Sequence, residues 1–213
     1  MSDEATIYRG EPLQTYIDDA VSGKPAPGGG SVSACVGALG AALVSMVCNL
    51  TIGKEKFAPV EDTVRELVAR SEDCRARLEQ LLQDDTTAYN DVIVGYRMPK
   101  DTDEQQAART QHIQAALKHA ANVPLEIART ALEVCGLAKV AAEVGNPAAV
   151  TDAAIGAILG ESAAQGGALN VKINLGSIKD EDYVAACRQE LDELLAEAAT
   201  LRAEVLAITE STL

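Results

Sequence analysis

The sequence predicts an all-α protein, an antiparallel bundle of about six to seven helices in one domain over residues 1–213. Helical patterns with capping residues follow one another along the chain, and no run of strand patterns interrupts them. Apolar residues make up 47% of the chain but aromatic residues only 3%. A core of aliphatic and alanine side chains favours close helix–helix packing, and 213 residues suffice to bury one.

Seven helical segments are expected in order, over about residues 10–22, 31–52, 59–96, 103–123, 124–145, 147–170 and 180–208. Thr102 or Asp103 caps the fourth segment. Pro124 lacks an N–H, so it is expected to kink or restart the chain before the fifth. Asn146 is the expected N-cap of the sixth, with Pro147 at the first helical position.

Residues 25–31 read Pro-Ala-Pro-Gly-Gly-Gly-Ser and lead into the second helix. Consecutive glycines let a ligand approach the main chain closely. Ser31 is the expected N-cap, and the free N–H groups at the positive end of the helix would favour a carboxylate or phosphate against Gly28, Gly29, Gly30 and Ser31. The other interpretation is a helix entry packed too tightly for side chains, and the spacing does not decide between them.

Residues 31–53 contain no charged side chain and are long enough to cross a bilayer about 30 Å thick. Serine, asparagine and threonine interrupt the segment, and alanine and glycine dominate it. Lysines at positions 24, 54 and 56 flank both ends, so no charge asymmetry sets an orientation. A central bundle helix is therefore the better interpretation, and no membrane association is expected.

The formal net charge of −14 argues against nucleic-acid binding, because phosphates demand a basic face. The first residues lack a basic-then-apolar signal pattern, which predicts a cytoplasmic protein. The five cysteines show no metal-ligand spacing and are expected to be reduced and mostly structural. With only His112 and His119, a multi-histidine zinc site is not expected, and no metal ligands are assigned.

An inward seam of the third helix carries a carboxylate. The seam follows 3–4–3–4 spacing and comprises Val64, Leu67, Ser71, Cys74, Leu78, Leu81, Asp85, Ala88 and Val92. Asp85 thus occupies a position where an aliphatic residue belongs, and a buried carboxylate must be paired, hydrogen-bonded or protonated. Asp85 either has a structural partner or serves proton transfer or ligand binding.

The sixth helix places Asp152 on its apolar stripe near the N-terminal end, where the helix dipole favours a carboxylate. Structural and functional interpretations are both open for this residue. Further along, Asn170, Lys172 and Asn174 alternate with apolar residues after two glycines. They would either line a cleft or form a solvated turn, and their spacing does not decide.

Seven segments resemble the cyclodeaminase/cyclohydrolase family of folate enzymes, in the same order and over about residues 10–205. They are PAPGGGSVS at 25–33, AALVSMVCNLTIGK at 41–54, LQDDTTAY at 82–89, MPKDT at 98–102, VPL at 123–125, GNPAAVTD at 145–152 and ALNVKIN at 168–174.

The resemblance implies one of two activities. A cyclodeaminase closes 5-formiminotetrahydrofolate to 5,10-methenyltetrahydrofolate with loss of ammonia. A methenyltetrahydrofolate cyclohydrolase instead adds water to the methenyl compound and gives 10-formyltetrahydrofolate. The predicted bundle fills the 213 residues without a formiminotransferase domain, and residues 44–54 look closest to the stand-alone cyclohydrolase, so that activity is favoured.

The resemblance also implies a homodimer with folate in a cleft near the subunit interface, and no cofactor beyond the tetrahydrofolate substrate, with or without a polyglutamate tail. Asp85 matches the functional carboxylate of a family motif, and Lys54 matches a Gly-Lys motif. Asp152 ends a motif in which Thr151 stands where serine is usual. We expect Asp85 to take a proton from water, Asp152 to add to the local field, and Lys54 to orient water or a pterin oxygen.

The expected substrate-binding residues are Gly28, Gly29, Gly30, Ser31, Asn146, Asn170, Lys172 and Asn174, with the glutamate tail at the glycine loop or at Lys172. The loop and Lys54 lie at opposite ends of one helix, about 30 Å apart at 1.5 Å per residue, so one reacting centre would need two subunits. The competing class is a non-catalytic helical module that binds folate or a partner, in which Asp85 and the glycines are structural.

Overall fold

The computed structural model of the chain describes residues 6–213, and this part is helical apart from short connections. The all-α prediction is confirmed. The elements are the 3-10 turns η1 (Tyr8–Gly10), η2 (Glu55–Val60) and η3 (Pro147–Ala149), and the helices α1 (Leu13–Val21), α2 (Gly29–Asn49), α3 (Glu61–Thr87), α4 (Asn90–Arg97), α5 (Asp103–Val144), α6 (Val150–Leu175) and α7 (Glu181–Thr212).

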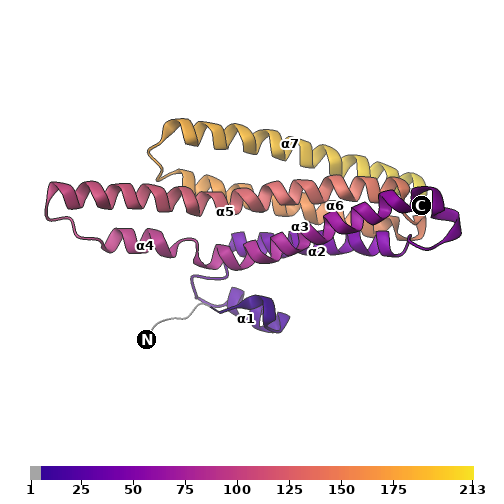
Figure 1. Cartoon of the computed structure of the whole chain (residues 1–213), viewed down its shortest axis with the longest axis horizontal. Coiled ribbons are helices and arrows are strands. Elements are labelled where there is room, and N and C mark those ends of the chain that lie inside the picture. The colour runs from indigo at the N-terminus through magenta and orange to yellow at the C-terminus, as the bar shows by residue number, and fades with distance from the viewer. Residues whose placement is uncertain (1–5) are drawn as a thin grey trace.

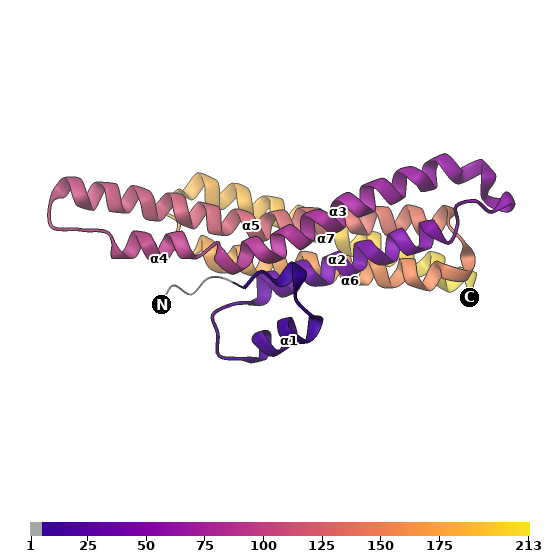
Figure 2. The same cartoon turned by 60° about the horizontal axis from the view of Figure 1, so that its bottom comes forward.

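The long helices lie side by side along one axis, and α1 stands on the flank of the bundle (Figure 1; Figure 2). Helix α6 packs against α2, α5 and α7, while α2 also packs against α3. Two apolar clusters fill the interior. One centres on α2, α3 and the start of α6, and the other on α5, α7 and the end of α6.

Small residues bring α2 and α6 close together. A Cβ on Gly40 would lie 3.0 Å from the carbonyl oxygen of Gly156, and a Cβ on Gly156 would lie 3.2 Å from that of Gly40. By length and composition α2 could cross a membrane, but 61% of its most apolar window is buried inside the protein. The uncharged sequence of α2 therefore forms the central helix of the bundle, as predicted.

The expected single helix over residues 59–96 is wrong, because the chain breaks at Ala88 and Tyr89 into α3 and α4. The break coincides with a change of packing partner. Leu82 belongs to the cluster around α2 and α3, whereas Val92 belongs to the cluster around α5. Gly95 also lies directly against Ile113, since a Cβ there would stand 2.8 Å from that side chain.

Pro124 does not restart the chain as a separate helix, because α5 runs unbroken from Asp103 to Val144. Proline leaves the carbonyl of the residue four positions earlier without its helical N–H donor. The side-chain amide of Asn174 donates to that carbonyl, on Ala120, at 3.0 Å. A side chain of α6 thus completes the hydrogen bonding of α5.

Residues 170–174 belong to α6, so the solvated-turn interpretation is wrong and the sixth helix ends at Leu175. Gly167 does not break the helix. It allows close contact with α5 instead, since a Cβ there would lie 2.8 Å from the carbonyl oxygen of Pro124. The cap at Thr102 is confirmed, whereas Asn146 caps the 3-10 turn before α6 and not α6 itself. Thr102 caps α5 in a capping box with Gln105.

Candidate active site

The carboxylate of Asp85 lies against the first turn of α2. Its Oδ2 atom accepts a hydrogen bond of 2.7 Å from the backbone N–H of Ser31. A Cβ on Gly30 would lie 2.2 Å from Asp85 Oδ1, so only glycine leaves space for this side chain. The anion held at the N-terminus of α2 is therefore a carboxylate of the protein itself.

Ser31 is not the N-cap of α2, because Gly28 holds that position and the helix begins at Gly29. The Ser31 side chain points to its neighbours instead. Its hydroxyl donates to the carbonyl of Leu82 at 2.9 Å, and its oxygen lies 2.9 Å from the hydroxyl of Tyr16. Because Ser31 gives its proton to Leu82, Tyr16 is the donor in the second bond.

Tyr16 was missed by the sequence reasoning. It lies on α1, 8% exposed, and nothing in its local pattern links it to Ser31 or Asp85. Burial raises the pKa of Tyr16 to about 12. The phenol therefore stays protonated at neutral pH and can serve as a fixed hydrogen-bond donor.

Burial raises the pKa of Asp85, and the hydrogen bond from the Ser31 N–H opposes that rise. A carboxylate with a raised pKa is a stronger base than a solvated one, and one backbone donor stabilises its ionised form. This balance suits a group that accepts a proton and returns it.

Of the other predicted binding residues, Asn170 lies near the Asp85 end of α2, whereas Lys172 lies on another face of the bundle. A Cβ on Gly29 would lie 3.3 Å from the amide nitrogen of Asn170. Asn174 is occupied by its bonds to the carbonyls of Ala120 and Asn170. Lys172 is exposed and lines a hollow between α6 and α7, so it does not join this group in one chain.

The remaining predicted residues gather at the opposite end of α2. The backbone N–H of Asn146 donates to the hydroxyl of Thr51 at 2.9 Å, which ties the start of η3 to the end of α2. Lys54 follows there, exposed, and Asp152 lies partly exposed in the first turn of α6. Helix α2 is 21 residues long. At 1.5 Å per residue, about 30 Å therefore separates Lys54 from Asp85 within one chain.

Comparisons with known proteins agree with this architecture. The family model described as "Formiminotransferase-cyclodeaminase" matches residues 12–193. The chain is 41% identical to a methenyltetrahydrofolate cyclohydrolase of Methylorubrum extorquens, over 94% of this chain and 97% of that protein. It is 35% identical to the formimidoyltransferase-cyclodeaminase of Sus scrofa, over 92% of this chain but only 36% of that protein.

A solved structure also matches. The crystal structure of formiminotetrahydrofolate cyclodeaminase from Thermotoga maritima aligns with a TM-score of 0.85 and 30% sequence identity, over 95% of this chain and 98% of that one. Family model, sequence relatives and solved structure therefore agree over nearly the whole length. The chain belongs to the formiminotransferase-cyclodeaminase family.

Proposed function

We propose that this protein is a methenyltetrahydrofolate cyclohydrolase, which hydrolyses 5,10-methenyltetrahydrofolate to 10-formyltetrahydrofolate. The observation that carries the proposal is the 41% identity to a protein of that name over 97% of its length. The matched cyclodeaminases of the formimidoyltransferase type are 32–35% identical, and the chain spans 36–37% of their length. The Asp85 site supplies the base that such a reaction requires.

The substrate carbon lies between two nitrogens of a cationic amidinium and is electrophilic without further activation. Asp85 takes a proton from the attacking water, so hydroxide adds to that carbon. The hydroxyl group of this adduct then loses its proton to solvent and becomes the formyl C=O on N10, while the bond from the carbon to N5 breaks and N5 receives the proton held by Asp85. The Ser31 N–H holds Asp85 in place throughout, and the net products are 10-formyltetrahydrofolate and one proton.

The active unit in this proposal is a homodimer. Helix α2 exposes Val32, Leu39 and Met46 at seven-residue spacing, and the adjacent α6 exposes Ile155 and Ile158. Two copies that each carry a net charge of −14 repel each other least across an uncharged face. A second copy of this chain is therefore the partner that this apolar surface fits best.

A two-fold axis across the middle of α2 would set two copies of that helix antiparallel. The Asp85 end of one protomer would then face the Lys54 and Asp152 end of its partner. In that arrangement Asp152 could add to the field at Asp85 and Lys54 could orient water or a pterin oxygen. Within one protomer a separation of about 30 Å exceeds the screening length of about 8 Å at physiological salt.

The test of the activity follows the ultraviolet absorbance of methenyltetrahydrofolate with purified protein against the uncatalysed rate. Accelerated decay supports the cyclohydrolase. No acceleration by folded protein contradicts it. The second candidate is formiminotetrahydrofolate cyclodeaminase, favoured by the match to the Thermotoga maritima structure. Ammonia released from formiminotetrahydrofolate, without methenyl hydrolysis, would select that activity, and activity in neither assay would favour a non-catalytic folate-binding module.

A separate experiment tests whether the active site is built from two subunits. Sedimentation should give a dimer, and the variants Asp85→Asn and Lys54→Ala should each be inactive alone. Random subunit exchange makes half of the dimers hybrid, each with one intact site, so about a quarter of wild-type activity should return on mixing. A monomeric protein, or hybrid dimers that stay inactive, would contradict a site built from two subunits.

A further inference from the structure

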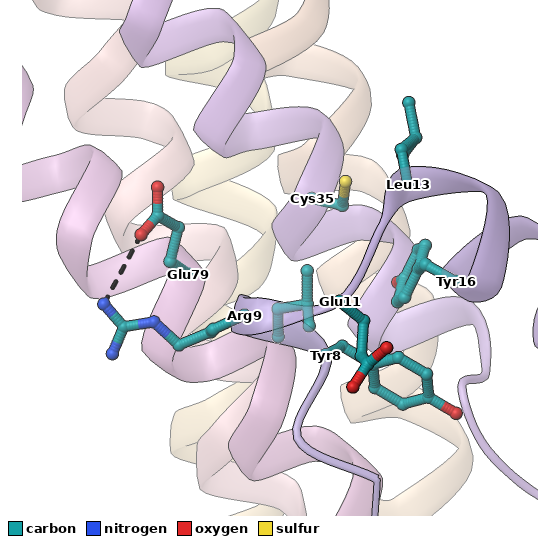
Figure 3. A pocket seen from close by; sticks show the side chains of 8 residues that line it. Tyr8, Arg9, Glu11, Leu13, Tyr16, Cys35 and Glu79 are labelled. Atoms are coloured by element: carbon teal, nitrogen blue, oxygen red, sulfur yellow. Dashed lines mark hydrogen bonds and ion pairs between the residues drawn. The ribbon is translucent and has the colours of Figure 1, made fainter.

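A pocket of about 250 Å³ lies between the N-terminal segment, residues 8–13, and the α2–α3 pair (Figure 3). Contacts with side chains of α3 hold the segment over it. The backbone N–H of Tyr8 donates to the side-chain carbonyl of Gln83 at 2.9 Å, and Arg9 pairs with Glu79 at 3.4 Å. The pocket is thus a formed feature of the fold, with an open mouth.

Its walls combine apolar and acidic groups with one basic side chain, Arg9. The rings of Tyr8 and Tyr16 meet edge to face with centroids 5.2 Å apart, and the first residue of α1, Leu13, lines the pocket although it is 67% exposed. Of the acidic groups, Glu79 is neutralised by arginine. Glu11 makes no ion pair or side-chain hydrogen bond with the residues that the structure describes, so its carboxylate is available to a ligand.

Two residues belong both to the pocket and to the Asp85 site. Tyr16 lines the pocket, and its hydroxyl donates to Ser31. Leu82 also lines the pocket, and its carbonyl accepts the Ser31 hydroxyl. Leu82 and Asp85 are three residues apart on α3, about 4.5 Å along the helix axis. A bound ring system that fills the pocket would therefore reach close to the proposed base, Asp85.

We infer that this pocket receives the pterin ring of the folate substrate, with Glu11 bound to the N–C–N donor edge of the ring. The inference rests on the proposed function. A carboxylate accepts two parallel hydrogen bonds from such an edge, as it does from a guanidinium. The reacting carbon joins N5 and N10 at the opposite edge of the bicycle, so Glu11 at one edge leaves that carbon turned toward Asp85.

Size and charge agree with this assignment. Pockets that enclose a drug-sized ligand hold about 300–1,000 Å³, so 250 Å³ accommodates a flat bicycle but not a whole folate. The rest of the molecule must leave through the open mouth. The methenyl ring system is cationic, and the Glu11 carboxylate and the tyrosine rings attract a cation, while Arg9 is paired with Glu79. The aminobenzoylglutamate end of the substrate is anionic, so the Glu11 carboxylate would repel it.

Cys35 provides a probe that does not depend on turnover. It lines the pocket and is half-buried, whereas Cys48, Cys74, Cys135 and Cys187 are buried. Burial raises the pKa of the Cys35 thiol, so alkylation with iodoacetamide is run under mildly alkaline conditions and mapped by peptide mass spectrometry.

Tetrahydrofolate and a methyltetrahydropterin fragment should each slow alkylation of Cys35 by about tenfold at saturation, and aminobenzoylglutamate should not. Protection by aminobenzoylglutamate alone would overturn the assignment. So would unchanged alkylation at folate concentrations that an independent titration shows to be saturating. A wild-type protein without hydrolase activity contradicts the proposed function but leaves this labelling result interpretable.

A charge-matched pair of variants tests Glu11 itself. Glu11→Gln should weaken binding of the tetrahydropterin fragment by about tenfold, because a charged hydrogen-bond acceptor is lost. Asp18→Asn removes the same charge from α1, at an exposed side chain bonded to Gln14, and should leave binding unchanged. Equal effects of the two variants would mean that only the overall charge matters, which overturns the role of Glu11.

Discussion

Two polar side chains lie on inner faces of the bundle, and they differ in what they do for the fold. Asn174 donates to the carbonyl of Ala120, which Pro124 leaves without a donor, and to the carbonyl of Asn170. Asp85 also accepts a backbone N–H that has no acceptor within its own helix, but it does so as a carboxylate whose burial disfavours the ionised form. A backbone N–H is directed to it from Ser31, and a glycine at position 30 keeps its space open.

The difference teaches how to separate structural from functional polar residues in a helical bundle. A side chain that satisfies a group already left unpaired stabilises the fold. A buried carboxylate that disfavours its own ionised form, and for which a neighbouring helix gives up a Cβ, costs stability, and that cost points to function. Substitution of Asn174 should therefore lower mainly the stability of the fold, and substitution of Asp85 should lower mainly the activity.

The largest effect is expected from Asp85→Asn. Loss of a general base lowers kcat by about 10²- to 10⁴-fold. The amide oxygen of asparagine can still accept the Ser31 N–H, so the fold is retained. Steady-state hydrolysis of methenyltetrahydrofolate measures the loss. Full activity in the variant would show that Asp85 is not the general base.

The same variant has an expected pH dependence of stability. Burial raises the folded-state pKa of Asp85 above its unfolded value, so the ionised carboxylate lowers the free energy of unfolding at neutral pH. Asp85→Asn should then be at least as stable as the wild type at neutral pH. The difference should shrink as the pH falls through the raised pKa, where the wild-type carboxyl is protonated. Urea unfolding across that range checks the sign.

Gly30→Ala should separate activity from stability. The new Cβ would lie 2.2 Å from Asp85 Oδ1, and the carboxylate can swing away from it. We expect a modest loss of stability but about a 100-fold loss of kcat, since a displaced catalytic group of this kind loses its alignment. Gly136→Ala is the control, because a Cβ at that helical position meets nothing within 4 Å. It should stabilise α5 by about 1 kcal/mol.

Tyr16→Phe should have a smaller effect, about a tenfold loss of kcat, because it removes one hydrogen bond to Ser31. Tyr8→Phe is the matched variant. It deletes the same atom from the other ring of the pair, whose hydroxyl donates to Asp19. The difference in kcat between the variants measures what the Ser31 contact contributes. Equal kcat values would mean that the Tyr16 hydroxyl has no role in the reaction.

Asn174→Ala should lower the free energy of unfolding by about 1–3 kcal/mol, because the Ala120 carbonyl loses its donor. In the Pro124→Ala background the backbone N–H returns, so the same substitution should cost less. A double-mutant cycle of thermal unfolding measures this coupling. Additive effects of the two substitutions would contradict the repair that the structure indicates.

Local patterns predicted much of the fold and part of this site. The 3–4–3–4 spacing placed Asp85 on an inner face, and capping chemistry placed Thr102 and Asn146 at helix starts. These signals depend on neighbours within one or two turns. The donor to Asp85 could not be found in this way, since Ser31 is 54 residues away and meets it only when α2 and α3 pack.

The errors share a cause. The local effect of Pro124 predicts a kink or a restart, but Asn174 supplies the missing donor from another helix and α5 continues. The spacing of Asn170, Lys172 and Asn174 leaves a solvated turn open, but α6 continues through them and packs closely on α5 at Gly167. In both cases tertiary contact overrides a local preference.

Because the chain breaks after Thr87, α4 forms a separate short helix that can unfold independently of the rest of the bundle. Helix α4 is eight residues long and packs mainly against α5, with Val92 as its anchor in the core. So short a helix has little stability of its own and can open locally at a free energy well below that of global unfolding. Because the break begins three residues after Asp85, this opening would change the surroundings of the carboxylate while the rest of the bundle stays folded.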